Sequence, residues 1–141
     1  MSARSAWVAL FACVLAGCGP ADARDAAMIA GGEPARGERA IRLYGCGTCH
    51  DIPGITGAKG TVGPPLAGFA ARSYIGGVLP NEPEHLVNWI MAPQDIDPKT
   101  AMPNLGVTAQ DARDIAAYLY TLTDGGLGPP HPVPSSVLPV H

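Results

Sequence analysis

The chain has 141 residues, which allows one domain of modest size and leaves little room for a second. Its 9 basic and 12 acidic side chains give a formal net charge of −3, so it lacks the basic excess that nucleic-acid binding requires. It holds 18 glycines and 15 prolines, and only 6% of its residues are aromatic. A small domain with so little bulky core is expected to need a disulfide, metal or cofactor. The residues most suited to form such a disulfide, or to bind such a metal or cofactor, are the four cysteines, Cys13, Cys18, Cys46 and Cys49.

The first 17 residues have the pattern of an export signal. Arg4 precedes an uncharged, largely apolar segment at 6–17, which is too short to span a bilayer but suits the apolar region of a signal peptide. It ends in LAGC at 15–18, which resembles the bacterial lipobox, where the cysteine is lipidated and becomes the first mature residue. We expect a signal peptide at 1–17, lipidation of Cys18, and a protein anchored on the periplasmic side of a bacterial membrane. An ordinary signal peptide with an incidental cysteine is the alternative.

The segment after the signal is small and polar. We expect a flexible tether at 18–32 and a compact domain at 33–124, because the tether has little apolar surface to bury. Removal of the signal would also remove Arg4, leaving 8 basic and 12 acidic side chains and a formal charge of −4. No aspartate follows Cys18, so the inner-membrane retention signal of some bacteria is absent, and the choice of membrane stays open.

The first predicted helix lies at the start of the domain. Gly37, Ala40, Ile41 and Tyr44 are spaced i, i+3, i+4 and i+7, which places them on one face of a short helix. A motif with two cysteines begins at Cys46, two residues after Tyr44.

The motif Cys46-Gly47-Thr48-Cys49-His50 is the signature of c-type haem attachment. Its two thiols can form thioethers with two haem vinyl groups, and the adjacent histidine can then bind the iron. A thioredoxin-like dithiol would need a βαβ context, and a zinc site would need a second pair of ligands. A structural disulfide would leave His50 unexplained. We therefore predict one haem c per chain, bound through Cys46 and Cys49.

A long loop rich in glycine and proline, 51–80, separates the motif from the second predicted helix. Asn81 is the predicted N-cap of that helix, Glu84 completes a capping box, and Pro93 ends the helix. Its apolar face consists of Leu86, Trp89 and Ile90.

Four side chains are candidates for the second iron ligand. Met28 lies in the predicted tether, Met91 is expected in the core, and His85 is expected to face solvent. Met102 lies in a loop flanked by prolines, which limit backbone freedom, so we favour it. Ligation by His50 and Met102 raises the reduction potential relative to two nitrogen ligands.

The third predicted helix begins at Thr108, with Asp111 at position N3, and is stopped by glycines at 125–126. Its apolar stripe consists of Ala112, Ile115, Ala116, Leu119 and Leu122. The tail at 125–141 contains five prolines and no charged side chain, so we expect it to be extended and disordered, with its histidines solvated. No long strand is predicted, which makes the domain all-α with long loops.

Seven short segments of the chain can be compared with known families: GERAI (37–41), CGTCH (46–50), VGPPLAG (62–68), AR (71–72), EHLVNWI (84–90), PKTAMP (98–103) and DIAAYL (114–119). In their order and spacing, these segments resemble class I c-type cytochromes over residues 37–122. This resemblance implies a cytochrome c fold, with three main helices and long loops wrapped around a single covalently attached haem. It also implies that Gly37 and Ile41 meet Ile115 and Tyr118 where the first and last helices cross.

The resemblance also implies roles for residues of the haem pocket. The carbonyl of Pro64 would accept the N–H of the His50 imidazole, and Leu66 would pack on the haem ring. Arg72 would pair with a buried propionate, Trp89 would lie over the haem on the methionine side, and Thr100 would bond the inner propionate. Tyr74 is a candidate for the other propionate by its proximity in sequence.

The chain departs from the family pattern at several positions. Ile41 replaces the usual aromatic residue of the first helix, and Gly45 is an extra residue before the first thiol. The lysine ring of mitochondrial-type members is absent, because Lys59 and Lys99 are the only lysines. Docking to partners through weakly charged or apolar surface is therefore expected.

These features predict a one-electron carrier that passes electrons between respiratory or dehydrogenase partners, with no enzymatic activity, no nucleic-acid partner and no small-molecule substrate. A haem enzyme or gas sensor with a labile methionine ligand is one alternative. A dedicated cytochrome subunit of a larger oxidoreductase complex is another, and a non-catalytic interaction module that recruits a partner through the proline-rich tail is a third.

Overall fold

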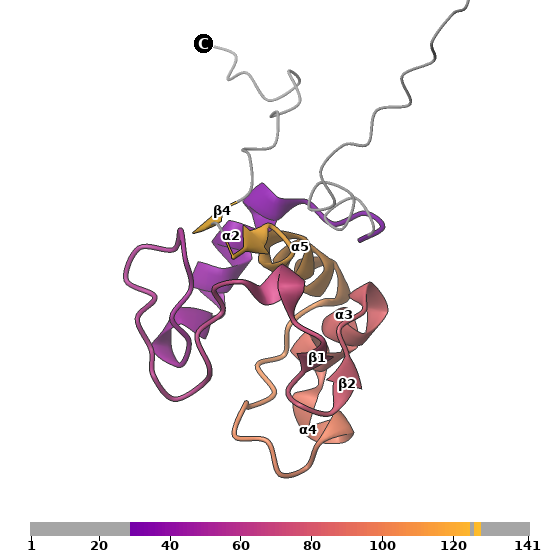
Figure 1. The fold of residues 1–141 in the computed structure, drawn as a ribbon. Coiled ribbons are helices and arrows are strands. Elements are labelled where there is room, and N and C mark those ends of the chain that lie inside the picture. The colour runs from indigo at the N-terminus through magenta and orange to yellow at the C-terminus, as the bar shows by residue number, and fades with distance from the viewer. Residues whose placement is uncertain (1–28, 125, 128–141) are drawn as a thin grey trace, which may run out of the picture.

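The computed structural model describes residues 29–124, 126 and 127, which fold mainly into helices joined by long loops (Figure 1). Within these residues, four α-helices and two short 3-10 helices are interspersed with four two-residue strands. In chain order, the elements are α2 (Pro34–Leu43), η1 (Cys46–Thr48), η2 (Phe69–Ala71), β1 (Tyr74–Ile75), β2 (Leu79–Pro80), α3 (Pro83–Met91), α4 (Pro93–Ile96), α5 (Ala109–Leu119), β3 (Leu122–Thr123) and β4 (Gly126–Leu127).

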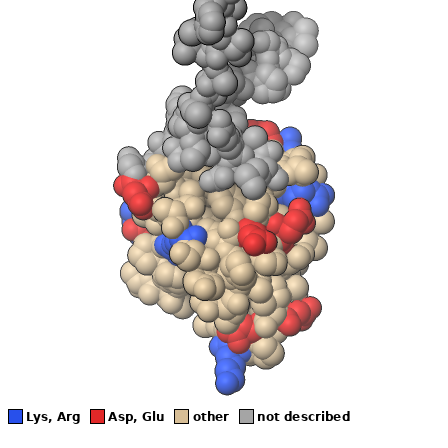
Figure 2. Space-filling model, turned by 45° about the vertical axis from the view of Figure 1, so that its right-hand side comes forward, with Lys and Arg blue, Asp and Glu red and all other residues tan. Residues whose placement is uncertain are grey.

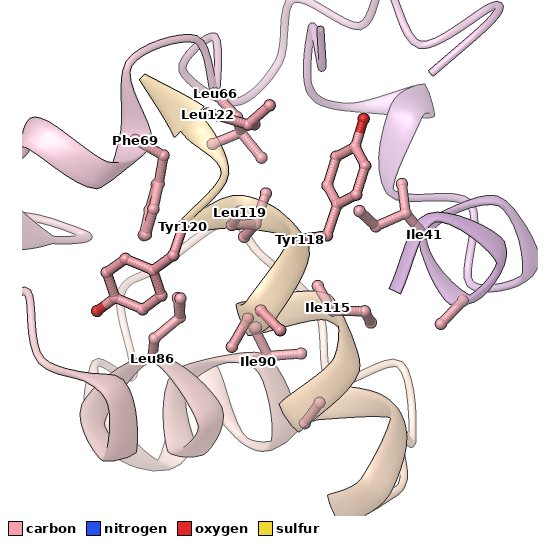
Figure 3. Close-up of a cluster of buried hydrophobic side chains, with 14 of the residues drawn as sticks. Ile41, Leu66, Phe69, Leu86, Ile90, Ile115, Tyr118, Leu119, Tyr120 and Leu122 are labelled. Atoms are coloured by element: carbon pink, nitrogen blue, oxygen red, sulfur yellow. The ribbon is translucent and has the colours of Figure 1, made fainter. Parts of the chain in front are cut away.

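Helices α2 and α5 cross in close contact, as predicted. A Cβ atom at Gly37 would lie 2.0 Å from the carbonyl oxygen of Asp114 and 2.9 Å from the Cβ atom of Tyr118. Only glycine therefore fits at this crossing. Figure 3 shows Ile41 of α2 beside Tyr118 and Ile115 of α5.

Polar side chains cap the starts of α2 and α5. Glu33 accepts hydrogen bonds from the backbone N–H groups of Ala35 and Arg36, and Thr108 accepts one from Asp111. These bonds satisfy N–H groups that have no partner within the helix. The predicted cap of α5 is thereby confirmed.

The predicted cap of α3 is wrong. The N-cap is Glu82, which makes no side-chain capping bond, and Pro83 is the first helical residue. Proline favours this position because its φ angle is already helical and its missing N–H is not needed there. Asn81 instead donates to the carbonyls of Phe69 and Arg72 and accepts a bond from the Tyr120 hydroxyl.

Two helix ends differ from the prediction. Pro93 ends α3 as expected but also begins the short helix α4. Helix α5 ends at Leu119, and the fully buried Leu122 lies in β3, which pairs antiparallel with β4. Residues 126–127, predicted to belong to the tail, thus take part in the fold.

The N-terminal boundary of the compact region also lies earlier than predicted. Ile29, assigned to the tether, is 3% exposed and belongs to the hydrophobic core. The predicted signal peptide, Cys18, Met28 and the tail histidines lie outside the described residues. Within the described part of the chain, no helix is long and apolar enough to cross a membrane.

Asp114 of α5 is buried at the crossing with α2. Its carboxylate accepts bonds from the Arg36 guanidinium at 2.7 and 2.8 Å, from the Glu33 backbone N–H at 2.8 Å and from the Gln110 amide at 3.1 Å. These bonds compensate for the loss of hydration and tie the start of α2 to α5.

Candidate functional site

A cavity of about 470 Å³ opens among the helices and loops, with a mostly apolar lining. Its size falls in the range of roughly 300–1,000 Å³ that is usual for ligand and cofactor sites. Every residue predicted to contact the cofactor lines this one cavity, although the residues come from segments far apart in the sequence: Cys46, Cys49, His50, Pro64, Leu66, Arg72, Tyr74, Trp89, Thr100 and Met102.

The two cysteines lie on a tight turn at one wall of the cavity. Gly45 precedes the turn with a φ angle of +70°, and the Thr48 hydroxyl donates to the Gly45 carbonyl at 2.8 Å. Both thiols are half-buried and free, so the alternative of a disulfide between them is not what the structure shows. Burial raises the pKa of the Cys46 thiol, and the neighbouring Cys49 raises it further.

His50 is held in one orientation by the loop that faces it. Its Nδ1 atom lies 2.8 Å from the carbonyl oxygen of Pro64, the contact that the family resemblance implies. A carbonyl only accepts hydrogen bonds, so Nδ1 carries the proton and the lone pair of Nε2 is left for a metal. A Cβ atom at Gly63 would lie 2.3 Å from the imidazole ring, so the loop backbone packs directly against it.

Among the three candidates for the second ligand that the structure describes, the cavity contains only Met102. Its side chain is half-buried against the core, and its backbone N–H donates to the Thr100 hydroxyl at 3.2 Å. Met91 packs against the core outside the cavity lining, as expected. His85 also lies outside the lining, with its Nδ1 atom 3.1 Å from the Pro80 carbonyl.

Arg72 is the one arginine, lysine, aspartate or glutamate among the described residues that line the cavity. Its guanidinium donates to the carbonyls of Pro65 and Ala67 and lies over the Phe69 ring, 5.6 Å from the centroid. It therefore holds the loop that follows His50 and offers its remaining donors to a carboxylate.

The aromatic residues of the cavity lie at different depths. Trp89 is 7% exposed, and a Cβ atom at Gly76 would lie 2.5 Å from its indole ring. Tyr74, on β1, is 60% exposed.

Sequence reasoning did not assign several other residues to the site. Ile52, Ile75 and Val107 are buried and line the cavity, but the segments that carry them have no periodic pattern that could have identified them. Tyr44, predicted only to share one face of the first helix, also lines the cavity, and its hydroxyl donates to Asp111.

These residues fit a haem better than other metal groups. Two free thiols, an imidazole with one available nitrogen, and a thioether surround an apolar space, and the described residues that line it include a single guanidinium. At Gly63 and Gly76 the lack of a Cβ atom lets the backbone pack directly against the rings of His50 and Trp89, which both line this space. A zinc site is not supported, because no group of three His, Cys, Asp or Glu residues in the described chain is placed to bind a metal ion.

Comparison with known proteins agrees with this assignment. The family model of cytochrome c matches residues 34–123. The chain belongs to the cytochrome c family. The predicted membership and the mostly helical cytochrome c fold are thus confirmed, and membership implies a covalently bound haem c at Cys46 and Cys49.

Two proteins that are similar to this chain show how much of it each match covers. The chain is 32% identical over 88 residues to cytochrome c oxidase subunit 2 of Alkalihalophilus pseudofirmus, a match that covers 62% of this chain and 25% of the relative. The chain thus spans only about a quarter of that relative. The solved structure of cytochrome c2 from Rhodobacter sphaeroides is 21% identical, with a TM-score of 0.46, and the match covers 65% of this chain and 97% of that one.

Proposed function

We propose that this chain is a one-electron carrier in which His50 and Met102 would bind the iron of the haem. Family membership supports electron transfer in general. The observation that carries the specific proposal is that the oriented imidazole of His50 and the thioether of Met102 line the same apolar cavity.

When bound, the haem supplies an iron that cycles between Fe(III) and Fe(II), taking one electron from a donor and giving it to an acceptor. The protein supplies the surroundings. Cys46 and Cys49 fix the group to the chain, and the Pro64 carbonyl keeps the proton on Nδ1 of His50 and makes Nε2 a stronger ligand. If His50 and Met102 both bind the iron, they would leave no position open for oxygen or peroxide, which favours a carrier over an enzyme.

A potentiometric titration of the purified protein tests this function. We expect a single reversible wave with the slope of a one-electron couple, and both reduction and reoxidation by membranes from the source organism. Turnover of oxygen or peroxide at enzymatic rates would contradict the proposal.

We further propose that the carrier is exported and held at the periplasmic side of a bacterial membrane by lipid at Cys18. The support is the sequence pattern of residues 1–18. Acyl chains stabilise membrane binding by about 0.8 kcal/mol per buried CH₂, so several chains make the anchor stable.

Mass spectrometry of the protein from its native membrane tests the anchor. The expected mass is that of residues 18–141 plus one haem and acyl groups. Cys18→Ala should release the protein from the membrane or leave it unprocessed, whereas Cys13→Ala, in the same signal, should change neither. An unmodified Cys18 in the mature protein would contradict the anchor.

Redox proteins are the proposed partners, namely an oxidase, a reductase or a dehydrogenase. The similarity to part of a cytochrome c oxidase subunit supports an oxidase among them. Purification after mild crosslinking would separate two forms of the proposal: a free carrier yields several partners in low ratio, and a dedicated subunit yields one complex in fixed ratio.

A further inference from the structure

Tyr44 connects the cysteine turn to the start of the last helix. It is the C-cap residue of α2 and lies two positions before Cys46. Its ring lines the cavity, and its hydroxyl donates a hydrogen bond of 2.8 Å to Oδ2 of Asp111 on α5.

The carboxylate that Tyr44 binds also belongs to the cap of α5. The Thr108 hydroxyl donates to the same Oδ2 atom at 2.8 Å, and the Asp111 backbone N–H donates back to that hydroxyl at 3.1 Å. The Thr108 backbone N–H in turn donates to the Tyr44 hydroxyl at 3.4 Å. Tyr44, Thr108 and Asp111 therefore form one closed network.

This network lies where the segment that carries Met102 ends. Residues 97–108 connect α4 to α5, and most of their hydrogen bonds are internal: Lys99 and Thr100 bond to Asp97, Met102 to Thr100, and Gly106 to Asn104. Beyond the adjoining helices, the described part of the chain offers this segment one hydrogen-bond partner, the Tyr44 hydroxyl.

We propose that Tyr44 is a positioning residue for the methionine ligand. By binding Asp111 and Thr108, its hydroxyl fixes the end of the 97–108 segment relative to α2 and to the cysteine turn, and so holds Met102 at the haem. The inference rests on the proposed ligation by Met102. Loss of the hydroxyl leaves the segment anchored mainly by apolar contacts, such as that of the buried Val107.

Tyr44→Phe tests the role, because it removes the hydroxyl and keeps the ring. The readout is the affinity of the oxidised holoprotein for imidazole, which must displace Met102 from the iron. We expect imidazole to bind about tenfold more tightly, the scale of one hydrogen bond to a charged group. Asp111→Ala should also raise the affinity for imidazole. The double variant should bind imidazole little more tightly than either single variant, because both changes break the same hydrogen bond between Tyr44 and Asp111.

Tyr118→Phe is the matched control. This tyrosine also lies at the α2–α5 crossing, and its hydroxyl donates to the Pro53 carbonyl at 2.7 Å, but it does not line the cavity. Its variant should lose stability without any change in imidazole affinity. If Tyr44→Phe, like Tyr118→Phe, leaves the affinity for imidazole unchanged, the Tyr44 hydroxyl is only structural and the positioning role is wrong.

Met102→Ala separates this inference from the proposed function. If it leaves imidazole affinity unchanged, Met102 is not the ligand and both proposals fail. If it raises the affinity while Tyr44→Phe does not, only the positioning role is overturned.

Discussion

At the scale of single residues, the orientation of His50 depends on the loop backbone beside it. The imidazole is held by the Pro64 carbonyl through Nδ1 and is covered by Gly63. A ligand fixed by two independent contacts loses little conformational freedom when it binds a metal.

Gly63→Ala should disturb this ligand directly. The added Cβ atom would lie 2.3 to 2.9 Å from three atoms of the His50 ring, so the ring or the loop must move. We expect a destabilisation of about 1–3 kcal/mol and a lower yield of holoprotein with both axial ligands in place.

Denaturant unfolding followed by tryptophan fluorescence, together with the haem spectrum, would measure both effects. Thr61→Ala, at an exposed position of the same loop, is the control and should resemble the wild type. A Gly63→Ala protein with unchanged stability and spectrum would show that the loop does not constrain His50.

At the scale of elements, the crossing of α2 and α5 carries a buried charge. Burial by itself raises the pKa of Asp114, but the hydrogen bonds from Arg36, the Glu33 backbone and Gln110 together lower it below its ordinary value of 3.8. The Asp114 side chain is 2% exposed, whereas that of Arg36 is 46% exposed and remains in contact with water.

The direction of this pKa change predicts how stability depends on acid. Because the pKa is lower in the folded protein, the pair contributes its full stability above the ordinary value of 3.8, and this contribution is lost as the pH falls through the folded-state pKa. Asp114→Asn should lower the free energy of unfolding by about 1–3 kcal/mol at neutral pH and flatten its decline in acid.

Urea unfolding between pH 7 and pH 3, about the range over which carboxylates protonate, would measure this dependence. Asp95→Asn on α4 is the control, because that side chain is exposed, and it should leave the curve unchanged. A variant at Asp114 with the same acid dependence as the wild type would contradict the role assigned to this pair.

Sequence alone predicted the elements whose signals are local. The apolar spacing of Gly37 and Ile41 gave the crossing face of α2, and Thr108 with Asp111 gave the cap of α5. The predicted cap at Asn81 failed because its side chain bonds to distant partners, which the local pattern does not contain.

Site residues that belong to a sequence motif were predicted, whereas those that reach the site only through packing were missed. The thiols and His50 lie together in the sequence, the flanking prolines singled out Met102, and the resemblance supplied Pro64. Tyr44 and the buried Ile75 could not be assigned, because the cavity forms only when helices, strands and loops far apart in the chain meet. Figure 3 shows how Leu66, Leu86 and Leu119, from three such segments, come together in the core.

At the scale of the whole molecule, charge is sparse and dispersed. On the face seen in Figure 2, acidic and basic side chains lie in small groups of mixed sign, and uncharged surface separates these groups. Lys59 is paired with Asp51 at 2.8 Å, and the described residues of the cavity lining include a single arginine, lysine, aspartate or glutamate, Arg72. Long-range attraction to a charged partner is therefore expected to be weak.

Electron exchange with partner membranes should accordingly change less than about twofold between low and physiological salt, because there is little charge to screen. Val62→Lys is the control for the assay, since Val62 is 75% exposed at the cavity and the new charge should introduce a salt dependence. A wild-type rate that falls several-fold with salt would indicate that charged side chains guide docking.

The most direct test of the proposed function is whether the haem iron has a coordination position that an added ligand can occupy. The purified, reduced holoprotein is exposed to carbon monoxide at neutral pH, and its optical spectrum is compared with that of Met102→Ala. Ligation by His50 and Met102 predicts no change for the wild type and ready binding for Met102→Ala, with Met91→Ala behaving like the wild type. Ready binding of carbon monoxide by the wild-type protein would contradict ligation by Met102 and, with it, the function as a simple electron carrier.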